Sequence, residues 1–354
     1  LLTSPDRIDL TDKADLTDGT DKKRGVTMVQ QLTKTQVEWW LENEEDEFYL
    51  DKLRTKHQID PESDNFYKAI SRLCDEKKLR RLGRGLYRKI KPVKPIQWRD
   101  ADESKYYDFK WFKSHSDYST FGFEDTINIS ANDLVVIAGV SNYGKSTLAL
   151  NLLGENVDTN PCILMGNEYT TLANMPSPKF KRRMMRMNWV DWGTPDGKDK
   201  FLLLPIRKNY EDYIEGGNLT IIDWINLTDN FYRIGKIFED IKTATGNGVA
   251  VAVIQKEEGA DLGRGRGFTR DMADVYFSID PYGKGESRLT VGKVKDPKRP
   301  IEGRIWAFKI VDSGANLTEI REIERCKKCK TKGFTPAGPC QSCNGKGYVD
   351  VMLI

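Results

Sequence analysis

Residues 134–147 read LVVIAGVSNYGKST, and this stretch decides the fold. Its first five residues form an apolar run typical of a buried strand, and a helix-like apolar pattern follows at 148–153. Between them lies G-x-x-x-x-G-K-S, the pattern of a phosphate-binding loop in its usual strand–helix context. The backbone N–H groups of such a loop point inward at phosphate oxygens, and the helix N-terminus adds favourable partial charge. The plainer alternative is a tight strand–helix turn that binds no ligand.

The pattern assigns a role to each residue of the loop. The residues expected to hold the nucleotide are Gly139, Ser141, Asn142, Tyr143, Gly144, Lys145, Ser146 and Thr147. Lys145 should reach the β- and γ-phosphates, and the Ser146 hydroxyl should ligate Mg²⁺. We therefore expect ATP and Mg²⁺ as cofactors.

Further short apolar runs follow the loop at 162–165, 201–206, 219–222 and 249–254. Helical segments separate several of them, most clearly at 227–243. This alternation predicts an α/β fold with a mainly parallel sheet flanked by helices, whose ligands gather at the carboxyl ends of the strands. The end of the region, at 273–279, 288–294 and 304–311, also reads as strands.

Informative polar residues end three of these runs, namely Glu168, Asp223 and Gln255. With the phosphate-binding loop, the series resembles the RecA-like ATPases over about 131–320, especially the DnaB-type helicase core. The resemblance implies that Glu168 polarises the attacking water, that Asp223 supports Mg²⁺, and that Gln255 senses the γ-phosphate. Lys145, Glu168 and Gln255 are then the catalytic set for ATP hydrolysis. A solvated loop acid is the alternative for Glu168, and a helix cap is the alternative for Asp223.

A glycine- and arginine-rich loop follows Gln255. In RecA-like proteins the loop at this place faces a central channel and contacts single-stranded DNA. The candidate contacts are Arg264, Arg266 and Arg270, with Phe268 available to stack on a base. A surface loop without a ligand is the alternative. The resemblance also implies a homo-oligomeric ring or filament.

Lys293-Val294-Lys295 stands near the place where DnaB-type rings carry a Lys-x-Arg pair that reaches the neighbouring subunit's γ-phosphate. This chain departs from that pattern. Lys293, Lys295 or Arg299 could serve instead, and a turn with exposed charge is the alternative.

Residues 28–95 predict three helices, the third capped by Ser63 or Asp64, and then a basic hairpin around Gly83-Arg84-Gly85. The series resembles a winged helix-turn-helix domain, which implies duplex DNA contact through the third helix and the wing. The candidate residues are Asn65, Lys68, Arg72, Arg80, Arg81, Arg84, Arg88 and Lys89. A protein-binding winged helix is the alternative. We expect residues 1–27 to be disordered and 96–130 to form a linker whose aromatic residues dock on a neighbouring subunit or on the ATPase core.

Four cysteines in the C-terminal segment, about 321–354, follow the pattern C-x2-C-x10-C-x2-C: Cys326, Cys329, Cys340 and Cys343. Two C-x2-C pairs supply the four thiolates of a tetrahedral, structural Zn²⁺ site. The second pair, with Gly345 and Gly347, resembles the zinc knuckle of the DnaJ cysteine-rich region. Disulfides and an Fe–S cluster are the alternatives, and a reducing cytoplasm disfavours disulfides.

Composition sets the remaining expectations. The 354 residues carry a net charge of +3 and 31% charged side chains. Since we find neither an apolar stretch of membrane-spanning length nor a secretory signal, we expect a cytoplasmic protein of a bacterial, archaeal or phage-infected cell, without a membrane partner. The resemblances together imply a DNA-binding ATPase that translocates on, unwinds or remodels DNA in replication or recombination of a phage or mobile element. An ATP-gated DNA-binding regulator or loader is the alternative, and a non-hydrolysing scaffold is a third.

Overall fold

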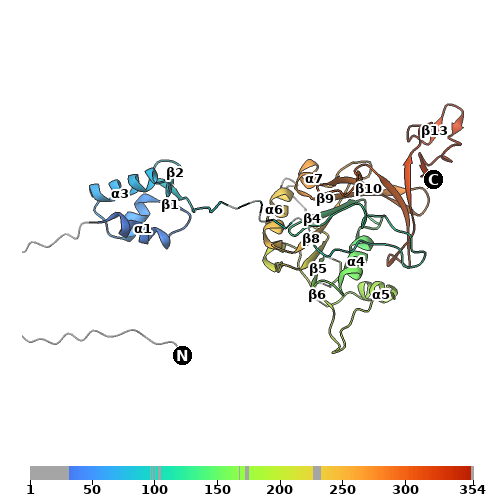
Figure 1. The fold of residues 1–354 in the computed structure, drawn as a ribbon, viewed down its shortest axis with the longest axis horizontal. Helices are drawn as coiled ribbons and strands as arrows, with labels where there is room; N and C mark the ends of the chain where they lie inside the picture. Colours follow the sequence, from blue (N-terminus) through green and yellow to red (C-terminus); the bar gives the residue numbers. More distant parts are fainter. Residues whose placement is uncertain are drawn as a thin grey trace, which may run out of the picture. The chain divides into compact units, whose positions relative to one another are not determined.

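The computed structural model describes residues 32–95, 97, 99, 101–102, 105–166, 168–171, 175–225 and 233–351. The chain forms two compact units, residues 1–101 and 102–354, drawn as ribbons in Figure 1. The segment 1–27, expected to be disordered, lies outside the described residues. None of the helices in the described ranges combines the length and apolar character needed to cross a bilayer.

The described residues of the first unit form three α-helices and a three-stranded antiparallel sheet of order β1-β3-β2. In chain order the elements are α1 (Lys34–Glu42), β1 (Glu47–Tyr49), α2 (Leu50–Lys56), α3 (Asp64–Asp75), β2 (Leu79–Arg81) and β3 (Leu86–Lys89). Thr33 and Gln36 form a reciprocal capping box that begins α1. On α3, the buried residues recur at helical spacing: Phe66, Ala69, Ile70 and Leu73.

Two details of this unit differ from the pattern in the sequence. Strand β1 lies within the acidic stretch 42–51, where no strand was expected; Phe48 is its one buried side chain and packs into the unit's core. Tyr67, which lies beside Phe66 in the apolar pattern of α3, is 42% exposed. Ser63 is the N-cap of α3 by backbone conformation, although its side chain makes no capping hydrogen bond.

The second unit is built on a ten-stranded sheet of order β15-β12-β11-β10-β9-β4-β8-β7-β5-β6. The strands from β9 to β6 in this order are parallel, and β10, β11, β12 and β15 extend the sheet in antiparallel fashion. The bounds are β4 (Leu134–Gly139), β5 (Cys162–Gly166), β6 (Phe201–Leu204), β7 (Leu219–Asp223), β8 (Val249–Gln255), β9 (Val275–Tyr282), β10 (Glu286–Val294), β11 (Ile305–Val311), β12 (Asn316–Arg325) and β15 (Tyr348–Asp350). The predicted mainly parallel α/β sheet is confirmed.

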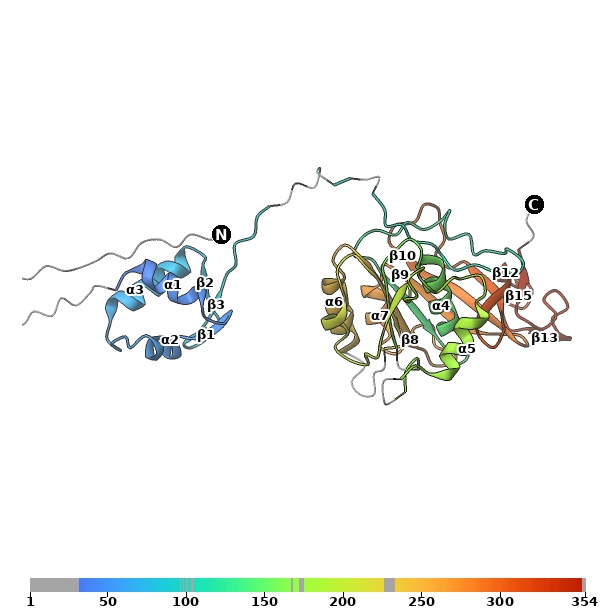
Figure 2. The ribbon, with the colours of Figure 1, turned by 90° about the horizontal axis from the view of Figure 1, so that it is seen from below.

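Helices cover both faces of this sheet (Figure 2). Their bounds are α4 (Lys145–Asn156), α5 (Pro178–Arg186), the short 3-10 helix η2 (Tyr210–Tyr213), α6 (Ile234–Thr245) and α7 (Gly267–Met272). Alternate residues of β4 explain the layering: Val135 and Ile137 pack with α4, whereas Leu134, Val136 and Ala138 pack with α6. The helix expected at 227–243 corresponds to α6, and residues 226–232 lie outside the described part.

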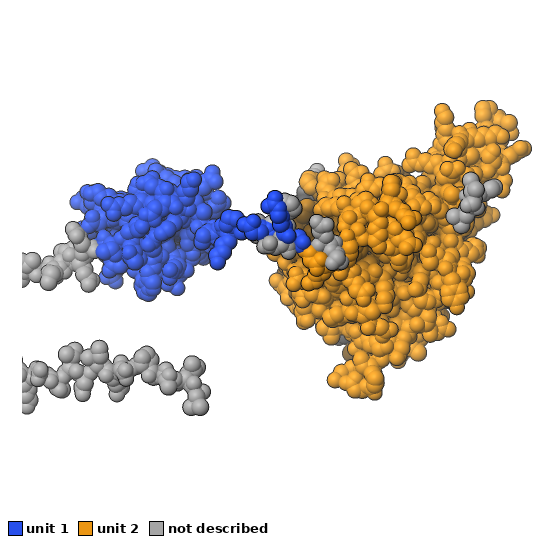
Figure 3. Space-filling model, in the orientation of Figure 1, with its two compact units in different colours: residues 1–101 blue, residues 102–354 orange. Residues whose placement is uncertain are grey.

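Residues 105–130, expected to be a linker, belong to the second unit (Figure 3). Trp111, Phe112 and Phe123 are at most 2% exposed and pack edge-on or stacked against Phe277 of β9. This arrangement answers the open question of where these aromatic residues dock, because they complete the core of the same chain. Burial of large aromatic rings stabilises a fold strongly. A segment without regular secondary structure can therefore be anchored by its aromatic side chains.

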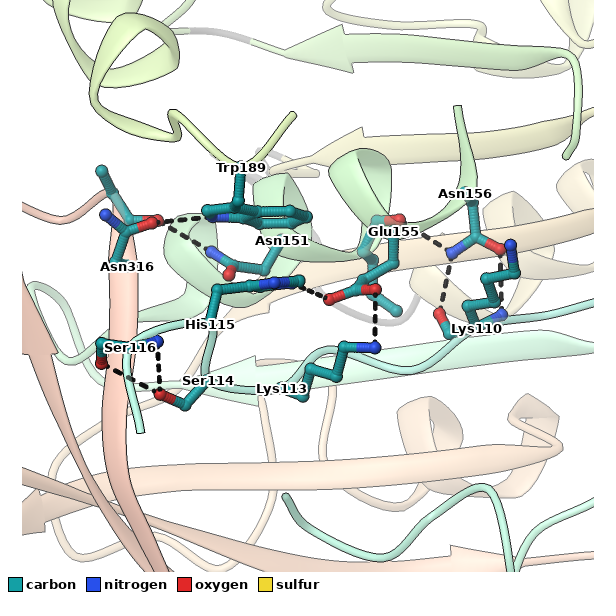
Figure 4. Close-up of polar contacts among 12 residues, drawn as sticks. Lys110, Lys113, Ser114, His115, Ser116, Asn151, Glu155, Asn156, Trp189 and Asn316 are labelled. Carbon is teal, nitrogen blue, oxygen red and sulfur yellow. Dashed lines mark hydrogen bonds and ion pairs between the residues drawn. The ribbon is translucent and has the colours of Figure 1, made fainter. Parts of the chain in front are cut away.

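Polar contacts fix the same segment to α4, as Figure 4 shows, and also to β12. His115 and Lys113 both reach the buried Glu155 carboxylate, at 2.6 and 3.6 Å, and His115 stacks on Trp189. Asn156 exchanges hydrogen bonds with the Lys110 backbone. Further along, the Asp117 carboxylate accepts the backbone N–H of Glu319, and the Ser119 hydroxyl oxygen accepts that of Ile320.

The C-terminal segment is part of the sheet and not a separate appendage to it. Strand β12 continues to Arg325, past the boundary expected near residue 320. The chain then forms a cysteine-rich module containing the small hairpin of β13 (Phe334–Thr335) and β14 (Gly338–Pro339). It returns as β15, which pairs with 323–325 of β12.

Candidate nucleotide site and metal centre

The phosphate-binding loop lies between β4 and α4, as the sequence predicts. Gly144 has φ of 100°, in the left-handed region that favours glycine. A Cβ at this position would lie 2.5 Å from Cδ1 of Ile310. At Gly139, a Cβ would come within 2.9 Å of Ile279 and Lys145 side-chain atoms. Both glycines are therefore required by backbone geometry and close packing.

A cavity of about 590 Å³ opens above this loop. Its lining residues are Ser141, Asn142, Tyr143, Gly144, Lys145, Ser146, Thr147, Glu168, Arg183, Trp224, Gln255, Arg264, Gly285, Glu286, Ser287, Ile310 and Gly314. The cavity thus brings together most of the expected nucleotide-binding residues with Glu168 and Gln255. Gly139 precedes the loop at the end of β4, and Asp223 is buried at the end of β7, so neither lines the cavity.

Strand order explains why these residues meet. Strand β8 lies between β4 and β7, and Gly139 is the register partner of Gln255. On the next pair of strands, Asp223 is the register partner of Gly166, two residues before Glu168. Since these strands are parallel, their carboxyl ends share one edge of the sheet. The three polar residues therefore converge on the loop.

Lys145 is a buried cation at the floor of the site. Its residue is 7% exposed, and its ammonium group donates to the Val140 carbonyl at 2.9 Å. Burial lowers the pKa of Lys145, while the nearby carboxylates of Asp223 and Glu168 oppose that shift. A buried ammonium at the start of a helix that follows a strand–helix loop is suited to bind a polyphosphate.

The two carboxylate oxygens of Asp223 differ in their hydrogen bonding. The Tyr169 hydroxyl donates to its Oδ2, whereas Oδ1 is buried and has no hydrogen-bond partner among the described residues. Burial raises the pKa of Asp223, and the Tyr169 hydroxyl and the nearby Ser146 hydroxyl oppose this shift. Burial likewise raises the pKa of Tyr169. A buried oxygen without a partner, close to a serine hydroxyl, fits the oxygen ligands that Mg²⁺ prefers.

Sequence reasoning missed several residues of this site. Tyr169 carried no motif, and its contact with Asp223 spans 54 positions of the chain. Arg183 lies on α5, in a region for which the sequence offered no assignment. Arg264, expected only as a DNA contact, also lines the nucleotide cavity. Glu286 lines its wall from β10 and forms ion pairs with Arg321 at 2.7 Å and Lys346 at 3.5 Å.

The loop after Gln255 forms a second cavity, of about 650 Å³. Arg264 and Arg266 line it together with Phe268, which is 52% exposed. Arg270 is exposed on the short helix α7, outside this lining. The structure thus places two of the three expected arginines at one concave surface.

Lys293 and Lys295, considered as inter-subunit fingers, bind within their own chain. The Lys293 ammonium donates to the carbonyls of Arg270 and Asp271, at 2.9 and 2.8 Å. Lys295 pairs with the buried Asp274 at 2.7 Å. These contacts support the end of α7 and the start of β9. Arg299 is exposed.

In the first unit, six of the seven cations expected to contact DNA are exposed: Lys68, Arg72, Arg80, Arg81, Arg84 and Arg88. Lys68 pairs with Asp64 at 3.3 Å, and the other five have no ion pair within the described residues. Lys89 differs from this expectation. Its ammonium donates to the carbonyls of Leu41 and Glu44, so it ties β3 to the end of α1.

The four cysteines of the C-terminal module face one point. Their Sγ atoms all lie within 4.8 Å of one another, with separations of 3.8 Å for Cys326–Cys340 and 3.6 Å for Cys329–Cys343. Tetrahedral zinc with Zn–S bonds of ~2.3 Å places its sulfurs about 3.8 Å apart. A disulfide needs about 2.05 Å, so these sulfurs are not bonded to each other. The set is compatible with zinc.

The module contacts the strand that lines the nucleotide cavity. Arg288 of β10 donates to the Tyr348 hydroxyl, and its guanidinium lies 4.7 Å from the centre of the Tyr348 ring. Lys346 reaches Glu286, as described above. The residues just after the last cysteine are therefore bonded to the cavity wall.

No protein-family model matches the chain, and no curated protein matches it. Several solved structures are similar to it at 14% identity. One is a DnaB-like replicative helicase, with TM-score 0.39 over 53% of this chain and 59% of the helicase. A KaiC-like protein from the hyperthermophilic archaeon Pyrococcus horikoshii OT3 has TM-score 0.44, over 60% of this chain and 99% of that protein. The RadB recombinase has TM-score 0.39, over 53% and 90%. The match thus spans less than two thirds of the helicase's own length.

Proposed function

We propose that the chain binds ATP with Mg²⁺ in the cavity above β4 and hydrolyses it. The main support is the convergence of Lys145, Glu168 and Gln255 on one cavity, beside the buried Asp223, whose Oδ1 has no hydrogen-bond partner among the described residues. Hydrolysis requires a water aligned with the γ-phosphate and neutralisation of the charge on the leaving oxygens. These residue types supply both requirements.

Each residue has a defined task in this proposal. Lys145 holds the β- and γ-phosphates, and the N–H groups of the loop hold the remaining oxygens. Glu168 accepts a hydrogen bond from the attacking water and orients it in line with the γ-phosphate. Gln255 donates to the γ-phosphate and changes its contact when that phosphate leaves. Ser146 and Asp223 hold Mg²⁺, which when bound neutralises charge on the phosphate oxygens.

We further propose that DNA is the partner of this ATPase. The element order α1-β1-α2-α3-β2-β3 and the exposed cations of the hairpin support a winged helix-turn-helix that contacts duplex DNA. Its contacts are Lys68, Arg72, Arg80, Arg81, Arg84 and Arg88, and those of the core loop with a single strand are Arg264, Arg266 and Arg270. Such contacts provide affinity more than sequence choice. The activity is translocation on, unwinding or remodelling of DNA in replication or recombination, by a homo-oligomeric ring or filament. The four-cysteine module holds a structural zinc ion.

The test measures ATP binding and turnover for the wild-type chain and two variants, with and without single-stranded DNA. Lys145→Ala should lose ATP binding, while Glu168→Gln should keep binding and lose most turnover, because only the water-orienting carboxylate is gone. Lys236→Ala, which removes an exposed cation paired with Asp240, is the matched control and should behave as wild type. Wild-type protein that binds no ATP would refute the proposal.

Stimulation by DNA distinguishes the motor from its main rival. Turnover that rises with single-stranded DNA, together with strand displacement on a fork, supports the motor. ATP binding without either effect supports an ATP-gated DNA-binding regulator or loader instead.

A further inference from the structure

Helix α5, Pro178–Arg186, carries a concentration of positive charge that the nucleotide site does not use. Five of its nine residues are cationic and none is acidic: Lys179, Lys181, Arg182, Arg183 and Arg186. Four of these recur at i, i+3, i+4 and i+7, which places them along one side of the helix. Phe180, Met184 and Met187 are buried in the core. The sequence thus builds an amphipathic helix whose outer face is a cationic stripe.

Within the described part of the chain, the charge of this stripe has no acidic partner. None of the five cations forms an ion pair with any acidic residue in the described ranges, and four of them are exposed. Other exposed lysines of the same unit do have partners: Lys198 pairs with Asp196, Lys236 with Asp240 and Lys309 with Glu319. Like charges three and four residues apart destabilise a helix slightly. An anion from outside would remove that cost.

A cavity beside the stripe connects it to the catalytic candidate. Its volume is about 590 Å³, and it is lined by Lys179, Arg182 and Arg183 on one side and by Glu168 and Tyr169 on the other. Arg183 also lines the nucleotide cavity. An anion bound along α5 would therefore lie next to the carboxylate proposed to orient the attacking water.

We infer that α5 is a binding surface for the phosphodiester backbone of single-stranded nucleic acid. The stripe spans about 10 Å along the helix, long enough to contact successive phosphates. Arginine forks bind phosphate oxygens in a bidentate manner, and three of the five cations are arginines. Met185, 70% exposed beside them, offers an adaptable apolar surface for a base. The choice of nucleic acid over an acidic protein rests on the proposed function.

The test compares binding of a fluorescein-labelled 20-nucleotide oligothymidine to full-length chains by anisotropy, over a range of salt concentrations. The triple variant Lys179→Gln/Arg182→Gln/Arg186→Gln removes three cations outside the nucleotide cavity and keeps good helix formers. The control Lys198→Gln/Lys236→Gln/Lys309→Gln removes the same charge from paired lysines. We expect the α5 variant to bind the oligonucleotide about tenfold or more weakly than wild type. The slope of log Kd against log salt concentration should be shallower by about 2, since each phosphate contact with a single strand contributes about 0.7 to that slope. The control should match wild type.

Equal Kd and slope for the α5 variant and the control would overturn the inference. So would an α5 variant that keeps wild-type oligonucleotide affinity but loses self-association, because α5 would then be a subunit interface. If the triple variant does not fold, crosslinking of wild-type protein to a photoreactive oligothymidine decides the question: adducts within residues 179–186 support the inference, and adducts only elsewhere refute it. The assay contains no ATP, so failure of the nucleotide proposal would not be mistaken for failure here.

Discussion

The Tyr169 hydroxyl holds the buried carboxylate of Asp223 at the end of β7. It donates to Oδ2, whereas Oδ1, which we propose as a ligand of Mg²⁺, has no hydrogen-bond partner among the described residues. Tyr169→Phe should raise the Mg²⁺ concentration needed for half-maximal binding of a fluorescent ATP analogue by about tenfold, since a hydrogen bond to a charged group contributes ~1.5–3 kcal/mol.

Binding of the ATP analogue in the absence of Mg²⁺ should change little in Tyr169→Phe. Tyr107→Phe, which removes a hydroxyl bonded to the Gly217 carbonyl, is the matched control and should leave the Mg²⁺ dependence unchanged. An unaltered Mg²⁺ midpoint in Tyr169→Phe would show that the tyrosine merely fills space.

Asp133, in the turn before β4, makes stability depend on pH. Burial raises the pKa of its carboxyl group to about 6, aided by the charge of Asp274, against a hydrogen bond from the Ser130 N–H. Because the folded-state pKa is above the unfolded one, the carboxyl group favours the folded state most below its unfolded pKa, and this contribution is lost as pH rises through about 6.

Asp133→Asn should therefore raise the unfolding temperature at pH 8, by about 2 °C or more, and have much less effect near pH 4. Thermal unfolding followed by circular dichroism at several pH values measures the difference. Asp125→Asn, at an exposed position, provides the baseline. A gain that is the same at every pH would exclude titration of Asp133 as its cause.

Among single residues of the site, those that follow a local sequence pattern were predictable. The loop, Glu168, Asp223 and Gln255 each follow an apolar run, so strand ends could be inferred and their convergence expected. Tyr169 and Arg183 were not predictable, because their importance comes from partners brought close only by the folded sheet. The sequence left open whether Lys293 is a finger or exposed charge, because its carbonyl partners on α7 cannot be read from the sequence.

At the scale of elements, the segment 105–130 makes the clearest test of packing. Trp111 is 2% exposed and contacts Phe109, Phe112, Phe123 and Phe277. Trp111→Ala should cost about 3–5 kcal/mol and lower the unfolding temperature of the second unit by on the order of 10 °C.

The matched control is Trp39→Ala, because Trp39 is 62% exposed on α1. Scanning calorimetry should show a shift for the first substitution and almost none for the second. If Trp111→Ala unfolds at the wild-type temperature, the segment behaves as a linker and its docking is weak.

The elements themselves were predictable to different degrees. Runs of apolar residues identified β4, β5, β7 and β8, because strands buried on both faces are continuously hydrophobic. Periodicity identified α1 and α3. The segment 105–130 shows neither the helical nor the strand periodicity of apolar residues, because isolated aromatic residues anchor it. The sequence therefore suggested a linker. Strand β12 was missed because its burial alternates irregularly among charged residues.

For the whole molecule, the four-cysteine module joins the sheet to the nucleotide cavity wall. Zinc analysis of purified protein should find one ion per chain, and Cys340→Ser should lose it. Without the metal, the module should unfold and trypsin should cleave after Lys327, Lys328, Lys330 or Lys332, which lie between β12 and β15. Structural zinc sites contribute folding free energy directly.

Cys74→Ser, in the first unit, is the control and should keep both the zinc and the resistance to trypsin. A chain without bound zinc that still resists trypsin between β12 and β15 would contradict a structural role for the metal.

The covering of β12 bears on how the molecule avoids aggregation. A ten-residue strand at the border of a sheet offers unpaired N–H and C=O groups that can template growth by another copy. Here β15 occupies 323–325, while Asp117 and Ser119 accept the N–H groups of Glu319 and Ile320. Two segments distant in sequence thus shield the border, and the outermost strand that remains is only three residues long. Loss of either shield would favour insoluble, strand-to-strand assemblies even in a chain whose phosphate-binding loop is intact.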